Sequence, residues 1–181
     1  MDSFEFAFSL FGLVLGLSVT EVISGFARVL RHRGKLRLGW LTPMLGLLLL
    51  VDLVTFWLNA WHMRQGIPLS FEALLFGTAV ASIYFLSASL VFPQDVGEWA
   101  DLDDYFLRHK GQVMIGVIVA NLMVSGVRDW VIGPPPSNWQ GYAIALIYTS
   151  LGVVFILAKG KRLAGALLAI LLSLYVIFRY L

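Results

Sequence analysis

Two carboxylates interrupt otherwise apolar stretches of this sequence, Glu21 in the first stretch and Asp52 in the second. A charge within the hydrocarbon of a bilayer is costly, so an ionisable side chain at that depth is a candidate functional group. At about 1.5 Å of helix per residue, Asp52 lies roughly 18 Å from Trp40, near the middle of its stretch, and Glu21 lies in the inner third of its own. A carboxylate at such a depth can take up a proton or a small cation.

Polar residues of the second and fourth apolar stretches recur at helical spacing. Residues three and four positions apart share one face of a helix. Two polar faces result, one formed by Asp52, Thr55 and Asn59 and the other by Asn121, Ser125 and Arg128. If these faces meet, they line a path that opens to the outside and has Asp52 and Asn121 at its floor. These residues, together with Glu21, are therefore the candidates for binding a proton or cation.

A structural interpretation of the same residues stays open. Asn, Ser and Thr side chains often join membrane helices by hydrogen bonds of modest strength. On this interpretation Asp52 is a contact between helices, hydroxyl groups near Glu21 satisfy that carboxylate, and Arg128 forms an interfacial ion pair with Asp129. The two interpretations differ in whether a hydrated cavity or a tight contact holds Asp52.

The composition indicates which elements position these residues. The chain has 181 residues, of which 59% are hydrophobic and 13% are charged. Soluble domains are about 45–50% apolar and about 25% charged, so the composition excludes a soluble globular protein. A helical crossing takes about 20 apolar residues. We predict an all-α polytopic membrane protein, a single domain over residues 1–181, with six transmembrane helices at about 5–27, 40–62, 71–92, 112–132, 142–158 and 163–180.

The positive charges gather on one side of this arrangement. Ten of the 13 Lys and Arg residues lie in or beside the first, third and fifth loops, and the exceptions are Arg64, Arg128 and Arg179. Loops rich in Lys and Arg stay in the cytoplasm. We therefore expect these three loops to be cytoplasmic, both termini to be outside, and the chain to lie in the plasma (inner) membrane with the lipid bilayer around it.

The third loop, residues 93–111, is the only sizeable one in this arrangement. Its apolar residues recur at helical spacing, at Trp99, Leu102, Tyr105 and Phe106. This pattern predicts a short amphipathic helix that lies in the inner membrane interface. Three acids of the loop are interpreted either as part of a structural elbow or as a gate that pairs with the basic first loop, and they match a cation site only loosely. These acids are Asp101, Asp103 and Asp104.

Small residues in the first stretch predict close helix packing. Gly12, Gly16, Thr20 and Ser24 follow one another at intervals of four, a spacing that lets two helices approach closely. We expect this contact within the chain, and a homodimer seam is the alternative.

Matching residues also recur at a constant offset of 99 positions, among them Ser24-Gly25 with Ser125-Gly126 and Trp40 with Trp139. A unit of three helices that is repeated once must be inverted in the membrane. The offset therefore indicates a weak 3+3 inverted repeat.

Several kinds of chemistry find no support in the sequence. The chain has no cysteine, which excludes thiolate metal sites and a cysteine nucleophile. The three histidines are predicted to lie on two sides of the membrane, so they cannot share a zinc ion. No nucleotide-binding loop or hydrolase motif is present. We predict no catalytic residue, metal, cofactor or nucleic-acid partner, and an enzyme is the less favoured class.

The sequence favours a small multi-pass transporter or channel for a proton or small cation, with a polar path centred on Asp52 and Asn121. A first alternative is a non-transporting subunit or scaffold of a larger membrane complex, which short loops and close-packing glycines suit. A second alternative is a lipid-handling membrane enzyme that uses acids of the third loop together with Glu21, Arg31 and Arg33.

Overall fold

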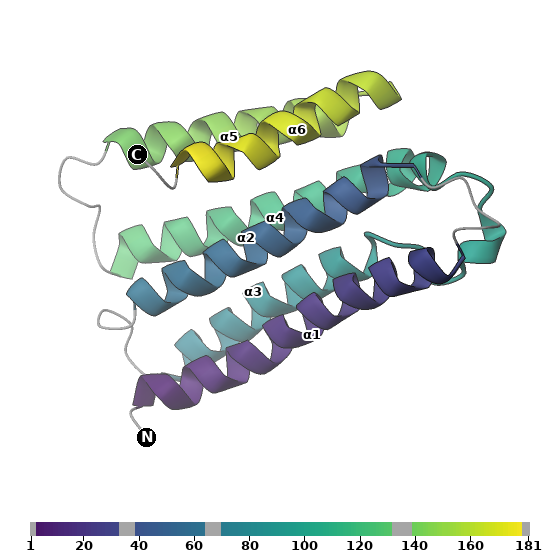
Figure 1. Cartoon of the computed structure of the whole chain (residues 1–181). Coiled ribbons are helices and arrows are strands. Elements are labelled where there is room, and N and C mark those ends of the chain that lie inside the picture. The colour runs from purple at the N-terminus through teal and green to yellow at the C-terminus, as the bar shows by residue number, and fades with distance from the viewer. Residues whose placement is uncertain (1–2, 33–38, 64–69, 132–138, 179–181) are drawn as a thin grey trace.

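The structure, a computed structural model, describes residues 3–32, 39–63, 70–131 and 139–178, and the regular elements in these ranges are all helices (Figure 1). Each of the six predicted stretches overlaps one α-helix. The elements in chain order are α1 (Ser3–Arg31), α2 (Leu41–His62), α3 (Phe71–Ser89), the 3-10 helix η1 (Val96–Glu98), α4 (Leu102–Val131), α5 (Trp139–Leu157) and α6 (Lys161–Phe178).

Five of the helices, α1 to α5, are long and apolar enough to cross a membrane, judged by length and composition of the described residues. The prediction of a helical membrane protein is confirmed at this level. The remaining helix, α6, has 18 residues and packs along α2 and α5. Large apolar side chains are exposed on the outer faces of the bundle, for example Leu13 and Leu146, as expected where lipid surrounds a protein.

The helices stack as three pairs (Figure 1). In this view α1 and α3 form the bottom layer, α2 and α4 the middle layer, and α5 and α6 the top layer, with contacts within and between layers. Successive helices run in opposite directions. We call the end at which α2, α4 and α6 begin the basic end. The start of α1 and the end of α6 therefore both lie at the opposite end, so the chain enters and leaves the bundle on one side (Figure 1).

Glycines let the chain segments of the bottom layer approach closely. A Cβ atom built on Gly25 of α1 would lie 2.2 Å from the ring of Phe92, and one on Gly77 of α3 would lie 2.4 Å from the ring of Phe11. Tyr84, Val80 and Ala81 of α3 are fully buried at the centre of this packing. The hydrophobic core is centred where α1, α2, α3 and α4 meet, and it extends into α5 and α6 through Phe155, Leu168 and Leu171.

The predicted small-residue stripe on α1 makes close contact at one position. A Cβ on Gly12 would lie 2.6 Å from the ring of Trp57, whereas nothing lies within 4 Å of a Cβ on Gly16. Thr20 is exposed and donates its hydroxyl to the carbonyl oxygen of Gly16 at 2.8 Å. Ser24 is half-buried, and its neighbour Gly25 makes the close contact described above. Within the chain, the stripe is therefore a close packing surface only near Gly12.

The third loop differs from its prediction. Instead of a separate interfacial helix after residue 98, α4 begins at Leu102 and continues without a break to Val131. Leu102 and Phe106 are buried on the face of α4 that also carries Val113 and Val117. These residues share one helix face, so continuing the helix buries them together in the bundle. The apolar pattern of the loop was thus the first part of the core face of α4.

The helix packing does not support the weak inverted repeat. A repeat would pair α4 with α6 as α1 pairs with α3. In the described residues α1 runs along α3, but α4 packs mainly on α2, α3 and α5, and α6 on α2 and α5.

Candidate functional site

Asp52 lies in the middle of α2, on the face that is buried in the bundle. Leu45, Leu49 and Leu53 of the same face are almost fully buried, and Asp52 itself is only 3% exposed. α2 lies in the middle layer and contacts α1, α3, α4 and α6. A carboxylate placed there loses its hydration and needs hydrogen-bond donors from the surrounding helices.

Three helices supply those donors. The hydroxyl of Tyr84 on α3 donates to Oδ2 of Asp52 at 2.8 Å. The side-chain amide of Asn121 on α4 donates to both oxygens of Asp52, at 3.2 Å to Oδ1 and 3.3 Å to Oδ2. The hydroxyl of Tyr175 on α6 donates to Oδ1. Each oxygen of the carboxylate therefore accepts hydrogen bonds from two side chains.

The network extends to a fifth helix. The hydroxyl oxygens of Tyr175 and Tyr148 on α5 share a hydrogen bond at 3.0 Å, and their rings meet edge to face. On the other side of the site, the ring of Phe56 packs on Tyr84 with centroids 5.1 Å apart. We call Asp52, Tyr84, Asn121, Tyr148 and Tyr175 the Asp52 network. Its members come from α2 to α6, so this one cluster joins all three layers.

The chemistry of the Asp52 network is that of a proton acceptor. Within the described part of the chain, Asp52 forms no ion pair with Lys or Arg, and its partners are hydroxyl and amide donors. No group of three or more His, Cys, Asp or Glu residues suited to a metal ion occurs among the described residues. A tyrosine hydroxyl can either donate or accept a hydrogen bond. The network can therefore bind a proton at Asp52 when a neighbouring hydroxyl turns from donor to acceptor, and it can release the proton by the reverse change.

The structure brings together two of the predicted path residues, Asp52 and Asn121. The other members of the two faces are placed differently. Thr55 donates its hydroxyl to the carbonyl oxygen of Val51 in its own helix at 2.9 Å. Asn59 is exposed and Ser125 is half-buried. The predicted stripes thus do not extend the Asp52 network by side-chain bonds toward the opposite end.

The two remaining charged candidates are each paired. Glu21 accepts a hydrogen bond from Arg28, two turns along α1, at 3.0 Å. Arg128 binds its neighbour Asp129 at 2.7 Å, and the other oxygen of Asp129 accepts a bond from Tyr142 of α5 at 3.0 Å. Glu21 is therefore held by an ion pair rather than by nearby hydroxyl groups, whereas Arg128 forms the pair that the structural interpretation anticipated.

Sequence reasoning missed the three tyrosines of the network. Tyr84, Tyr148 and Tyr175 lie on three helices, so no spacing in the sequence relates them. Tyrosine in membrane proteins usually lies at the bilayer surface with its hydroxyl toward water. The one signal available was the position of Tyr84 and Tyr148 inside predicted spans, away from their ends.

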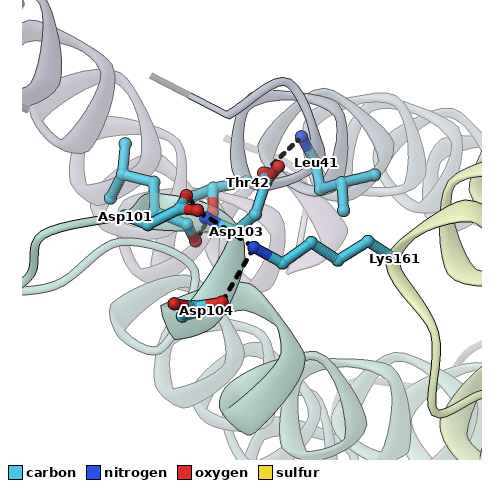
Figure 2. Close-up of polar contacts among 7 residues, drawn as sticks. Leu41, Thr42, Asp101, Asp103, Asp104 and Lys161 are labelled. Carbon is cyan, nitrogen blue, oxygen red and sulfur yellow. Dashed lines mark hydrogen bonds and ion pairs between the residues drawn. The ribbon is translucent and has the colours of Figure 1, made fainter. Parts of the chain in front are cut away.

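A second polar cluster lies at the basic end (Figure 2). Lys161 of α6 binds Asp101 at 2.9 Å and Asp104 at 2.8 Å. These two carboxylates raise the pKa of Lys161, which precedes the predicted sixth span, by hydrogen bonding to its charged form. The predicted partner of the acids, the basic first loop, lies largely outside the described residues at 33–38.

The third acid of this cluster caps a helix. Asp103 accepts a hydrogen bond from the backbone N–H of Leu41 at 3.3 Å, where α2 begins (Figure 2). Thr42 donates its hydroxyl to the carbonyl oxygen of Leu102 at 2.8 Å. A carboxylate at a helix N-terminus satisfies free N–H groups and favours the helix dipole. The cluster therefore joins the starts of α2, α4 and α6 and has a structural role.

Lys110 of α4 caps the C-terminal end of α5. Its side chain is almost fully buried, and its ammonium group donates to the carbonyl oxygens of Phe155 and Ile156, the latter at 2.9 Å. These carbonyls belong to the last turn of α5, which has no further N–H donors within the helix.

The fold and the site together define a helical membrane protein with a buried carboxylate whose hydrogen-bond network includes residues of five helices, α2 to α6. Comparison of the chain with protein-family models, with curated proteins and with solved structures found no significant match. The functional argument therefore rests on the Asp52 network.

Proposed function

We propose that this chain is a small membrane transporter or channel that moves protons, and that Asp52 is the group that gains and loses the proton. The observation that carries the proposal is the buried carboxylate in the middle of α2, which receives hydrogen bonds from α3, α4 and α6. Ionisable groups placed in this way within membrane proteins typically belong to proton or ion pathways.

The contacts of Asp52 favour a proton over a metal cation. Tyr84, Asn121 and Tyr175 all direct hydrogens at the carboxylate, so both of its oxygens are already engaged as acceptors. A hard cation needs several oxygen lone pairs pointed at one position. A proton needs one oxygen of Asp52 and the rearrangement of a single donor. We therefore propose a proton as the transported ion, whereas the sequence allowed either a proton or a small cation.

The proposed topology has six crossings in the plasma membrane. The basic end, where exposed Arg31, Lys159 and Arg162 lie, is cytoplasmic, and both termini are outside. This orientation follows from the positive charges, and the shared position of the start of α1 and the end of α6 supports an even number of crossings. Asp52 then lies near mid-membrane, where it has access to either side only through movement of helices or water.

Proton flux into proteoliposomes tests the proposal. The purified chain is reconstituted with a pH-sensitive dye inside, and a pH difference is applied while a potassium ionophore clamps the membrane potential. We expect flux above that of empty vesicles for the natural chain, and its loss in Asp52→Asn, which keeps the shape of the side chain but cannot ionise. Ser173→Ala is the control, because Ser173 is exposed on α6 and bonds only its own helix, at Ala169.

The outcomes are distinct. Flux that survives Asp52→Asn unchanged removes Asp52 from the pathway. No flux above empty vesicles for the natural chain, with folding verified by circular dichroism, contradicts the proposal as a whole.

A non-transporting subunit is the second candidate, and the completeness of the Asp52 network favours it. A carboxylate with donors on both oxygens is also a stable interhelical contact. The exposed apolar residues of α5, among them Trp139 and Leu157 at 72% and 70%, then face a partner helix. Gentle extraction followed by identification of stoichiometric membrane partners supports this candidate, and isolation without partners together with proton flux rejects it.

The groups suggested for a lipid-handling enzyme do not converge on one site in the described part of the chain. Glu21 pairs with Arg28, whereas Asp101 and Asp104 pair with Lys161. Arg33 lies outside the described residues.

A further inference from the structure

In the lower two layers, two glycines contact side-chain atoms that lie close to the neighbouring main chain. We call helices α1 to α4 the core and helices α5 and α6 the hairpin. In the core, a Cβ on Gly25 would meet the Cβ and ring base of Phe92, and one on Gly116 of α4 would meet Oγ of Ser87 at 2.0 Å. These atoms lie close to the main chain of their residues, so the helices of the core can shift little without collision.

The hairpin rests on the core through a different kind of surface. Of the 19 residues of α5, only Gly152 and Phe155 are buried. A Cβ on Gly152 would meet the terminal methyl groups of Met114 and Ile118, and one on Gly165 of α6 would meet a methyl group of Leu41. Ends of flexible side chains adapt to a shift by changing rotamer, so these contacts of the hairpin can yield when it moves.

Polar contacts hold the hairpin at three heights. At the basic end, Lys161 binds Asp101 and Asp104, and Lys110 of α4 binds the carbonyl oxygens at the end of α5. In the middle, Tyr175 binds Asp52 and, through its hydroxyl, Tyr148. Toward the opposite end, Tyr142 donates to Asp129 at 3.0 Å. The middle contact differs from the others because its acceptor is a buried carboxylate without an ion-pair partner among the described residues.

The strength of the middle contact depends on the proton of Asp52. The groups that face this carboxylate are Tyr84 from α3, Asn121 from α4 and Tyr175 from α6, with Tyr148 of α5 behind Tyr175, and no described residue of α1 bonds it. A hydrogen bond to an ionised carboxylate is roughly twice as strong as one between neutral groups. Protonation therefore weakens the bond to Tyr175, and Tyr175 retains its second bond to Tyr148 within the hairpin.

We propose that the hairpin is the moving part of this protein and that the bond between Tyr175 and Asp52 holds it on the core while Asp52 is ionised. This inference rests on the proposed function for the source of the proton. Protonated Asp52 releases the hairpin, which moves as one unit because Tyr148 and Tyr175 stay joined, and water then reaches the carboxylate between core and hairpin.

Distance measurements between spin labels test this movement directly. The chain has no cysteine of its own, so pairs of introduced cysteines label cleanly. The pair Phe71→Cys on α3 and Trp139→Cys on α5 measures the distance between core and hairpin. Both side chains are exposed, and both lie at the starts of their helices at the opposite end. Phe71→Cys with Leu58→Cys on α2 reports the core alone.

In lipid nanodiscs we expect the core-to-hairpin distance to lengthen by several ångströms, or its distribution to broaden, when the pH is lowered from mildly alkaline to mildly acidic. The core pair is expected to stay unchanged. Asp52→Asn, which mimics the neutral acid, gives the acidic distribution at both pH values. Tyr175→Phe removes the bond without altering Asp52 and is expected to do the same, so the test holds even if Asp52→Asn fails to fold.

A core-to-hairpin distance that is the same at both pH values and in both variants overturns the inference. If Asp52→Asn abolishes proton flux while the distances stay constant, the inference fails and the proposed function stands. If the distances respond and the natural chain moves no protons, the hairpin movement stands and the proposed function fails.

Discussion

The hydroxyl of Tyr175 on α6 donates a hydrogen bond to Asp52 on α2, across 123 positions of the sequence. Through this contact and its partner Tyr148, a carboxylate in the middle layer is bonded to both helices of the top layer. Tyr84 of the bottom layer and Asn121 of the middle layer also donate hydrogen bonds to this carboxylate. The principal candidate site is therefore also a point at which all three layers are joined.

Removing the buried hydroxyl of Tyr84 is expected to destabilise the protein. Tyr84→Phe leaves one oxygen of Asp52 with fewer donors in a buried site, and loss of such a partner costs about 1–3 kcal/mol. The measurement is the free energy of unfolding in detergent micelles. Tyr142→Phe removes an exposed tyrosine hydroxyl from a half-buried carboxylate, Asp129, and serves as the control with little expected change. Equal effects of the two substitutions contradict the buried network.

Two glycines of α1 are expected to respond in opposite ways to the same substitution. Gly25→Ala places a methyl group 2.2 Å from the ring of Phe92, and forcing these helices apart costs about 1–3 kcal/mol or more. Gly16→Ala meets nothing within 4 Å and gains up to about 1 kcal/mol of helix propensity. Thermal unfolding of both variants checks the packing of α1 on the core. A destabilised Gly16→Ala instead indicates that the exposed stripe is covered by a second copy.

Lys110 is expected to stabilise the end of α5. Lys110→Met keeps the apolar part of the side chain but leaves the carbonyl oxygens of Phe155 and Ile156 without this donor. A buried acceptor that loses its partner costs about 1–3 kcal/mol. Amide hydrogen exchange is expected to increase in the last turns of α5. Lys159→Met, at an exposed position of the same end, is the control, and exchange that rises equally in both variants argues against the cap.

The proposed orientation predicts which side of the membrane each end of the bundle faces. Single cysteines replace exposed Lys159 at the basic end and exposed Trp139 at the opposite end of the cysteine-free chain. In intact cells a membrane-impermeant maleimide should label Trp139→Cys only. Inside-out vesicles should give the reverse pattern. Labelling of Lys159→Cys in intact cells would place the basic end outside and reverse the topology.

The sequence predicted the helices well because membrane crossing imposes a long and simple apolar pattern. It also named Asp52 and Asn121 as the floor of a polar path on the condition that their two helix faces meet, and the structure brings these two residues together. It failed at the third loop, where the apolar face of residues 102–106 belonged to the core side of α4 and not to the membrane surface. It failed also for Tyr148 and Tyr175, because contacts between distant helices depend on layer order, which helical periodicity does not contain.

Infrared difference spectroscopy of the protein in lipid tests the central claim most directly, because the carbonyl band of a protonated carboxylic acid reports Asp52 itself. Between mildly alkaline and mildly acidic pH, the account predicts that such a band appears in the natural chain, shifts in Tyr175→Phe, and is missing in Asp52→Asn. A carboxylic acid band that is identical in the natural chain and in Asp52→Asn, or no band from Asp52 at any pH between these limits, would contradict the account.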